Sequence, residues 1–349
     1  MHEIAVALPE LAGLETLSPH RWRPLIIAGM HRSGTSLTAA GLQAAGLNLG
    51  ERLAGVSLGN EFGHFENLDF LNLHEDILRS QGHSPEGWVA NSSVPVPQAF
   101  VDRAREIVEK NASQDAWGWK DPRTTLFLDF WAELLPQANF LLLVRSPWEV
   151  VDSLFRRGDA IFADNPNHAL TVWLAYNQAI YDFYRKFQPR CLLITIDTFI
   201  QYPEEILATL NRKFSLSLKS STVPAFHAEA FNTDASASHR RTMMSEFFPE
   251  ATQLWQQLSD LSYCVSESLN DTSPPSTFRD WAFRDWFDLR SEQMSVKSTQ
   301  AEFQTEREEL TRAIEEMSSS LSWQITKPFR LLKWLLKTWF DALLECLKH

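Results

Sequence analysis

The segment IIAGMHRSGTSL, residues 26–37, joins an apolar run to a loop of small, hydroxyl and basic residues that can bind an anion. Gly29 and Gly34 permit tight backbone turns, and the N–H groups that open the following helix converge with the helix dipole on one point. The spacing of the two glycines, with four residues between them, nearly matches the phosphate-binding motif G-x-x-x-x-G-K-[ST]. The residues expected to contact the anion are Arg32, Ser33, Gly34, Thr35 and Ser36.

One position departs from the triphosphate-binding motif, because Thr35 stands where the motif has lysine. That lysine reaches the β- and γ-phosphates, and the next hydroxyl holds Mg²⁺. Here the cation is Arg32, inside the loop, and a guanidinium can bind an oxyanion through two parallel hydrogen bonds. We therefore expect the loop to bind a phosphate group, but not that of Mg-ATP. The alternative is an ordinary strand-to-helix turn.

A second group of basic and hydroxyl residues follows the apolar run NFLLLVR. Arg145 ends this run, while Ser153 and Arg157 fall one turn apart on one face of a helix expected to begin at Pro147. Ligands of open α/β sheets lie beyond the carboxyl ends of the strands. The three side chains are therefore expected to bind a second anionic group of one nucleotide. For Arg157 the alternative is a solvated charge that complements the helix dipole.

The elements that must position these residues form a parallel sheet. Apolar runs at 25–29, 139–145 and 191–196 predict buried parallel strands, with helices long enough for crossovers between them. The predicted class is α/β, a parallel sheet of the P-loop type flanked by helices. The expected division of the chain is a leader at 1–22, the α/β domain at 23–268, a linker at 269–290, a short coiled coil at 291–322 and a basic amphipathic tail at 323–349.

The two anion-binding segments together resemble the sulfotransferase superfamily, which uses 3′-phosphoadenosine 5′-phosphosulfate (PAPS). HRSGTS is similar to the 5′-phosphosulfate loop of that family and VRSPWEVVDSLFRR to its 3′-phosphate segment. WGWKDPRTTLFLDFW contains a Lys-Asp-Pro similar to that of tyrosylprotein sulfotransferases and many bacterial relatives, and LLITIDTFIQYPEEILATL resembles a later strand and helix. The Arg-Ser-Gly-Thr loop is typical of the tyrosylprotein and several bacterial branches. The resemblance implies PAPS as the sulfuryl donor and no metal.

The resemblance also implies roles in an in-line displacement at sulfur. Arg32 and the loop N–H groups would stabilise the leaving phosphate, and Lys120 would lie near the transferring sulfuryl group. For Lys120 the alternative is a structural salt bridge with Asp121. Arg123 could pair with the donor, with an acceptor anion or with structural partners. Three tryptophans, which could line a sugar site or pack in the core, are Trp117, Trp119 and Trp173.

A proton acceptor for the hydroxyl is expected after the loop and its helix, where related enzymes with an Arg loop take a glutamate. Glu66 is the first choice and Glu61 the second, while His64 suits proton transfer at neutral pH by its ordinary pKa. The alternative role for Glu66 is to cap the helix expected to begin near Leu68.

Composition argues against some functions and indicates the cellular compartment of the protein. The net charge of −12 argues against nucleic-acid binding. Three cysteines far apart indicate neither a disulfide framework nor a metal site, and we expect neither a signal peptide nor a transmembrane helix. We expect a cytoplasmic protein, placed at the inner face of a membrane by its basic, Trp-bearing tail. Docking of that tail on the body or on a partner is the alternative.

Residues 291–349 indicate what the chain could pair with and which acceptor it could use. Large apolar residues at 303, 310, 314, 317 and 321 form a short a/d seam that could pair two copies of the chain. The tail resembles one that follows coiled coils in bacterial glycosyltransferases of surface-polysaccharide clusters, so we expect a glycan hydroxyl as acceptor. The alternatives to a sulfotransferase are a P-loop kinase and a non-catalytic scaffold that retains the fold.

Overall fold

The structure is a computed structural model of the 349-residue chain, which divides into two compact units, Met1–Pro275 and Ser276–His349. In the first unit the structure describes residues 23–55, 65–113, 116–219 and 237–264. In the second it describes residues 296, 299–300, 303–317, 319–320, 325, 334 and 336–337. The predicted leader and linker, and nearly all of the predicted tail, lie outside these residues.

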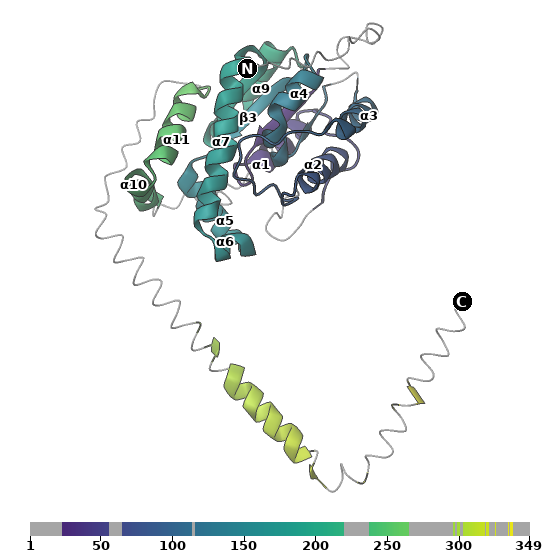
Figure 1. Cartoon of the computed structure of the whole chain (residues 1–349), viewed down its shortest axis with the longest axis vertical. Helices are drawn as coiled ribbons and strands as arrows, with labels where there is room; N and C mark the ends of the chain where they lie inside the picture. Colours follow the sequence, from purple (N-terminus) through teal and green to yellow (C-terminus); the bar gives the residue numbers. More distant parts are fainter. Residues whose placement is uncertain are drawn as a thin grey trace, which may run out of the picture. The chain divides into compact units, whose positions relative to one another are not determined.

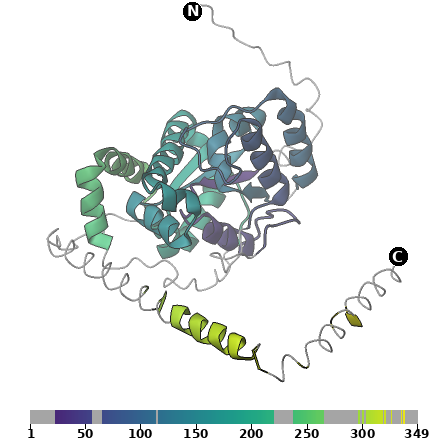
Figure 2. The same ribbon diagram turned by 60° about the horizontal axis from the view of Figure 1, so that its bottom comes forward.

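A four-stranded parallel sheet is the centre of the first unit (Figures 1 and 2). Its strands are β1 (Leu25–Gly29), β2 (Gly118–Lys120), β3 (Asn139–Val144) and β4 (Cys191–Thr195), in the order β2-β1-β3-β4. Each pair is parallel, with Leu25 opposite both Gly118 and Asn139, so all carboxyl ends lie at one edge. The predicted α/β class and the three strands predicted from apolar runs are confirmed.

Helices cover both faces of the sheet, which is why its strands are nearly continuous apolar runs. Alternate residues enter two separate cores: Phe140 and Leu142 of β3 belong to one, Leu141 and Leu143 to the other. The first core is completed by α2 (Leu68–Ser80), α3 (Val101–Asn111), α4 (Leu128–Leu134), α5 (Pro147–Arg157), α7 (Asn167–Phe187), α10 (Ala237–Phe247) and α11 (Pro249–Leu261). The second is completed by α1 (Thr35–Ala44), α8 (Ile196–Gln201) and α9 (Pro203–Phe214).

Short elements complete the first unit. They are α6 (Ala160–Asp164) and the 3₁₀ turns η1 (Gln98–Phe100), η2 (Pro122–Phe127) and η3 (Gln188–Arg190). Figure 1 shows the long helix α7 running beside β3, with α10 and α11 beyond it, in agreement with the packing of α11 on α7 and of α10 on α5.

Strand β2 is the part of the sheet that the sequence pattern did not predict. It has three residues and ends in Lys120, so it shows no apolar run. Gly118 is required by close packing, because a Cβ at this position would lie 1.9 Å from the carbonyl oxygen of Leu25. The strand carries Lys120 to the same sheet edge as the loop after β1.

In the second unit, residues 303–317 form one helix whose residues are all exposed. The coiled coil expected at 291–322 stays a prediction. Within the described ranges, none of the helices is both long enough and apolar enough to cross a bilayer.

Candidate active site

The loop between β1 and α1 has a backbone that its two glycines alone permit. A Cβ on Gly29 would lie 2.6 Å from the carbonyl oxygen of Leu143, and one on Gly34 would lie 2.4 Å from the Ile196 side chain. Gly34 also takes a φ of 87° where it caps α1. Between them Ser33 is fully buried, and its hydroxyl has no hydrogen-bond partner among the residues that the structure describes. A buried hydroxyl without a partner inside a tight loop can donate a hydrogen bond to an oxyanion bound there.

Arg32 joins this loop to the elements that follow β3. Its Nε donates to Ser153 Oγ on α5 at 2.8 Å, and its carbonyl oxygen accepts from Arg145 Nη1 at 3.2 Å. The indole of Trp173 holds Arg145 from α7, since Trp173 Nε1 donates to its carbonyl oxygen at 3.1 Å. The structure therefore brings together Arg32, Arg145 and Ser153, which lie far apart in sequence. Their anion-binding role stays a prediction.

Positive charge is concentrated at this point. Burial lowers the pKa of Arg32, and the nearby charges of Arg157, Arg145 and Arg156 lower it further. Arg157 is held at the rim by Asp159, 3.1 Å from its Nε, and its guanidinium lies 5.6 Å from the ring centroid of Trp88. A bound anion would relieve the repulsion among these guanidinium groups.

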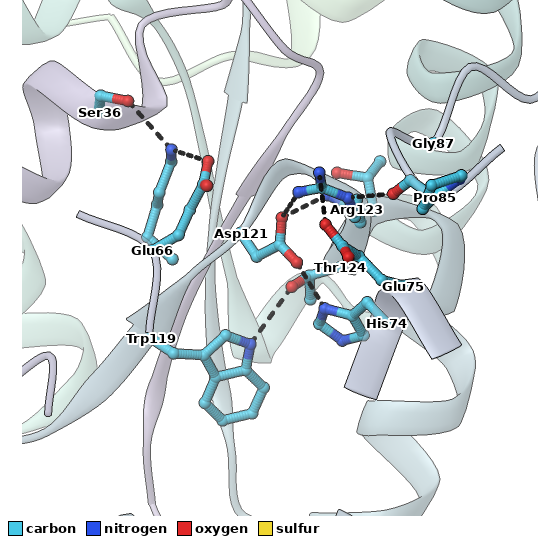
Figure 3. A network of polar contacts seen from close by, with 12 residues as sticks. Ser36, Glu66, His74, Glu75, Pro85, Gly87, Trp119, Asp121, Arg123 and Thr124 are labelled. Atoms are coloured by element: carbon cyan, nitrogen blue, oxygen red, sulfur yellow. Dashed lines mark hydrogen bonds and ion pairs between the residues drawn. The ribbon is translucent and has the colours of Figure 1, made fainter. Parts of the chain in front are cut away.

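Lys120 forms the second centre of the site, at the end of β2. Its Nζ donates to Ser36 Oγ at 3.0 Å and to Glu66 Oε1 at 2.9 Å. Figure 3 shows Ser36 and Glu66 converging on the same amine. The side chains of Lys120 and Glu66 are 1% and 8% exposed, so this ion pair is screened from water. It connects the loop helix, β2 and the segment before α2.

The structure contradicts the alternative role considered for Lys120, a salt bridge with Asp121, and the one considered for Glu66, capping of α2. Lys120 does not pair with Asp121, because neighbouring strand residues point to opposite sides and the Asp121 carboxylate faces His74 and Arg123 instead. Glu66 does not cap α2, since the Asn67 side chain takes that place and accepts from the N–H of Asp69 at 3.0 Å.

A largely buried polar network surrounds Asp121, the residue after Lys120 (Figure 3). Asp121 Oδ2 lies 2.7 Å from His74 Nδ1, and Asp121 Oδ1 accepts from Nη1 of Arg123 at 3.0 Å. Trp131 Nε1 donates to His74 Nε2 at 3.0 Å. Because an indole can only donate, His74 Nε2 is the acceptor and the proton sits on Nδ1, where it is donated to Asp121. The network fixes the corner that follows β2.

Opposing effects act on the ionisation of this network. Burial raises the pKa of Asp121, but the charge of Arg123 and the hydrogen bond from His74 outweigh it and hold that pKa well below its usual range. Arg123 donates from Nε to the carbonyl oxygen of Pro85 at 2.7 Å, and its side chain is 9% exposed. Of the roles considered for Arg123, the structure shows the structural one.

We expect Asp121→Asn to destabilise the fold by about 3–5 kcal/mol at pH 7, because it removes the nearer and fully buried carboxylate partner of Arg123 and leaves only Glu75, 3.4 Å away. A carboxyl whose pKa is lowered by folding stabilises above its unfolded pKa of about 4, and this contribution is lost as the pH falls below that value. Urea unfolding between about pH 7 and pH 3 should therefore show a shallower loss of stability for the variant than for the wild type.

A matched control for this experiment is Asp129→Asn, which removes a carboxylate that is 55% exposed and paired with Lys186. We expect it to change the free energy of unfolding by less than about 1 kcal/mol at any of these pH values. Equal pH dependence in Asp121→Asn and wild type would contradict the assignment.

His31 is a residue of the site that the sequence analysis did not single out. Its ring lies 4.7 Å from that of Trp88 and 6.2 Å from that of Tyr176. Burial, followed by the charge of Arg123, lowers the pKa of His31 well below its usual range, so the imidazole is neutral at pH 7. Its Nε2 is buried without a hydrogen-bond partner in the described part of the chain. Its position directly before Arg32 in the loop is the signal that could have found it.

The remaining sequence candidates fall into two groups. Glu61 and His64 lie outside the described residues. The three tryptophans at 117, 119 and 173 are at most 1% exposed. They pack in the core, which was the alternative to lining a sugar site.

Comparison with known proteins identifies the family of this chain. The Sulfotransferase family matches residues 24–220, which is more than half of the chain. A Caenorhabditis elegans protein named "Putative protein-tyrosine sulfotransferase" is 30% identical over 133 residues, covering 36% of this chain and 51% of the relative. The chain thus spans about half the length of this curated relative.

Among solved structures, the sulfotransferase domain from the curacin biosynthetic pathway is 18% identical, with a TM-score of 0.43 over 68% of this chain and 97% of that domain. Sulfotransferase STF1 of Mycobacterium tuberculosis is 15% identical, with a TM-score of 0.43 over 68% of this chain and 77% of that chain. The family match spans all four strands of the sheet and the loop, Lys120 and Arg145 that they carry. This chain therefore belongs to the sulfotransferase family.

Proposed function

We propose that the chain transfers a sulfuryl group from PAPS to an acceptor hydroxyl. The observation that carries the proposal is the contact, at one edge of the sheet, between the two segments that are predicted to bind anions. Arg32 of the loop donates to Ser153, and Arg145 donates to Arg32. A donor with two separated anionic groups needs two such segments side by side, and the buried hydroxyl of Ser33 supplies a further unsatisfied donor.

Each segment has one expected partner on the donor. Arg32 and the backbone N–H groups at the start of α1 would hold the phosphosulfate, where the helix dipole adds positive potential. Arg145, Ser153 and Arg157 would hold the 3′-phosphate. The proposed donor supplies an activated sulfuryl group whose leaving group is a phosphate, and no metal is needed in the proposal.

The reacting groups are those around Lys120. The Glu66 carboxylate would accept the proton of the acceptor hydroxyl as its oxygen bonds to sulfur and the bond from sulfur to the phosphate oxygen breaks. The Lys120 ammonium would stabilise the negative charge that develops on the transferring and leaving oxygens. Its contacts with Ser36 and Glu66 hold it between the loop and the base, so little reorganisation is required.

The acceptor that we propose is a glycan hydroxyl, on the resemblance of the tail to that of polysaccharide-cluster glycosyltransferases. The curated relative is named for protein tyrosine, which makes a peptide tyrosine the competing acceptor. We further propose that the chain works in the cytoplasm, at the inner face of a membrane contacted by residues 323–349. Turnover of PAPS with polysaccharide fragments and with tyrosine peptides would separate the two acceptors.

The donor is tested by calorimetric titration of 3′-phosphoadenosine 5′-phosphate (PAP), without metal, into wild type and Arg145→Ala. We expect micromolar binding by the wild type and a loss of about 10²-fold in the variant, since charged hydrogen bonds to a phosphate disappear. Arg156→Ala on the same helix is the control, because this side chain is 54% exposed and paired with Asp152. It should change the affinity by less than about threefold. Binding of Mg-ATP but not PAP by the wild type would overturn the proposal in favour of a kinase.

A further inference from the structure

The helix at 303–317 exposes a stripe of large apolar side chains that no other described residue of the second unit covers. A helix of this length is only marginally stable alone in water, so such a stripe predicts a partner. On a helical projection the four residues fall within a narrow sector, and the opposite face is wholly polar. Their exposed fractions are 67% for Phe303, 59% for Leu310, 59% for Ile314 and 52% for Met317.

The spacing of these residues fits a two-stranded coiled coil. Phe303, Leu310 and Met317 take successive d positions of a heptad, and Ile314 takes an a position. Isoleucine at a with leucine at d favours two parallel strands over three or four. The remaining a position in this stretch is Arg307, and a single charged residue at a fixes register and strand number at some cost in stability.

One charge of the seam has an opposite charge beside it. Glu306 occupies the g position and Arg307 the a position that follows it. In a parallel pair the g side of one helix lies against the a and e side of the other, so Glu306 meets Arg307 of the partner subunit, twice by symmetry. An antiparallel pair sets g against g and loses both contacts.

The charge of the helix favours a second copy of the helix over a lipid surface as the partner of the apolar stripe. Residues 303–317 contain five glutamates and two arginines, a net charge of −3, and four of the glutamates lie at b and c positions, away from the seam. Anionic lipid repels such a helix, whereas pairing through the seam leaves its acidic face in water. We propose that residues 303–317 of two copies of this chain form a parallel, in-register, two-stranded coiled coil. This proposal does not depend on the sulfuryl-transfer proposal.

The test is sedimentation equilibrium of the full chain over the micromolar range. Leu310→Asp/Ile314→Asp places charge in the seam and should weaken the dimer by about 10²-fold or more. Thr305→Asp/Ser319→Asp adds the same two charges on the opposite face and should leave the dimer within about threefold of wild type. Thermal unfolding of the sheet-bearing unit should be unchanged in both variants.

A charge exchange tests the parallel arrangement itself. Glu306→Lys sets two cations together in each contact and Arg307→Glu sets two anions together, so each should weaken the dimer by about 3- to 10-fold. The double exchange Glu306→Lys/Arg307→Glu should restore the wild-type affinity, as a coupled pair requires. Phe303→Cys, made with Cys264→Ser and Cys346→Ser, should form an intermolecular disulfide.

Four outcomes would overturn the proposal. They are a monomeric wild type, a dimer indifferent to the seam charges, a double exchange that fails to restore affinity, and seam-dependent binding to vesicles of phosphatidylglycerol and phosphatidylcholine by a monomeric chain.

Discussion

Glu66→Gln is expected to lower the turnover number by about 10²- to 10⁴-fold, the range that a positioned general base contributes. The amide retains an oxygen that can accept from Lys120 Nζ, now 2.9 Å from Glu66 Oε1, so the geometry around the amine is preserved. What the amide cannot do is take the hydroxyl proton. The affinity for PAP should therefore stay within about threefold of wild type, since neither of the segments proposed to bind PAP contains this residue. Single-turnover kinetics with PAPS and calorimetry with PAP check the two parts.

Glu66 and Lys120 form a buried ion pair, so a substitution can change the unfolding free energy as well as the turnover number. The two effects must be measured separately. Lys120→Met alone removes the amine that pairs with the buried Glu66 carboxylate and should cost about 3–5 kcal/mol of unfolding free energy. The double variant Glu66→Gln/Lys120→Met removes both charges and should recover most of that stability while staying inactive. If Glu66→Gln retains wild-type turnover, Glu66 is not the base and Glu61 becomes the first candidate.

The central strands and the loop could be predicted because they depend on local signals. Buried parallel strands need continuous apolar runs, and the runs at 25–29, 139–145 and 191–196 have no competing periodicity. The crevice rule then places Arg32, Arg145 and Ser153 at one edge before any coordinates are known. The structure brings these three together, with contacts of 2.8 and 3.2 Å.

The remainder of the site depends on tertiary partners that leave no local signal. Nothing in Lys-Asp-Pro shows that Asp121 turns away from Lys120 to meet His74, which is 47 residues earlier in the chain. The partner of Lys120 was equally hidden, because Glu66 and Asn67 are adjacent and either could have capped α2. Once Asn67 caps the helix, Glu66 is left to pair with the amine. Side-chain pairing across the fold decided both cases.

Arg32→Ala is expected to weaken PAP binding by about 10²-fold or more, while the free protein keeps its unfolding free energy within about 1 kcal/mol of wild type. The hydrogen bond from Arg32 Nε to Ser153 Oγ is lost. Against this loss, burial and the charges of Arg157 and Arg145 already disfavour the charged guanidinium, as the lowered pKa of Arg32 shows. Alanine meets the same backbone strain at a φ of 68°, so strain does not alter the comparison.

Arg190→Ala is the control for Arg32→Ala, because it should lower the stability of the fold and leave PAP binding unchanged. The Arg190 guanidinium is satisfied by the protein itself, donating to the carbonyl oxygens of Ala138, Ala132 and Leu135 at 2.9, 3.2 and 2.7 Å. Its loss should destabilise the fold and leave PAP affinity unchanged. PAP at about 100 times its Kd should stabilise wild type and Arg190→Ala alike, by about 2.7 kcal/mol, and Arg32→Ala far less. If Arg32→Ala behaved like Arg190→Ala, Arg32 would be a structural arginine, and the loop after β1 would have to bind its anion by backbone N–H groups alone.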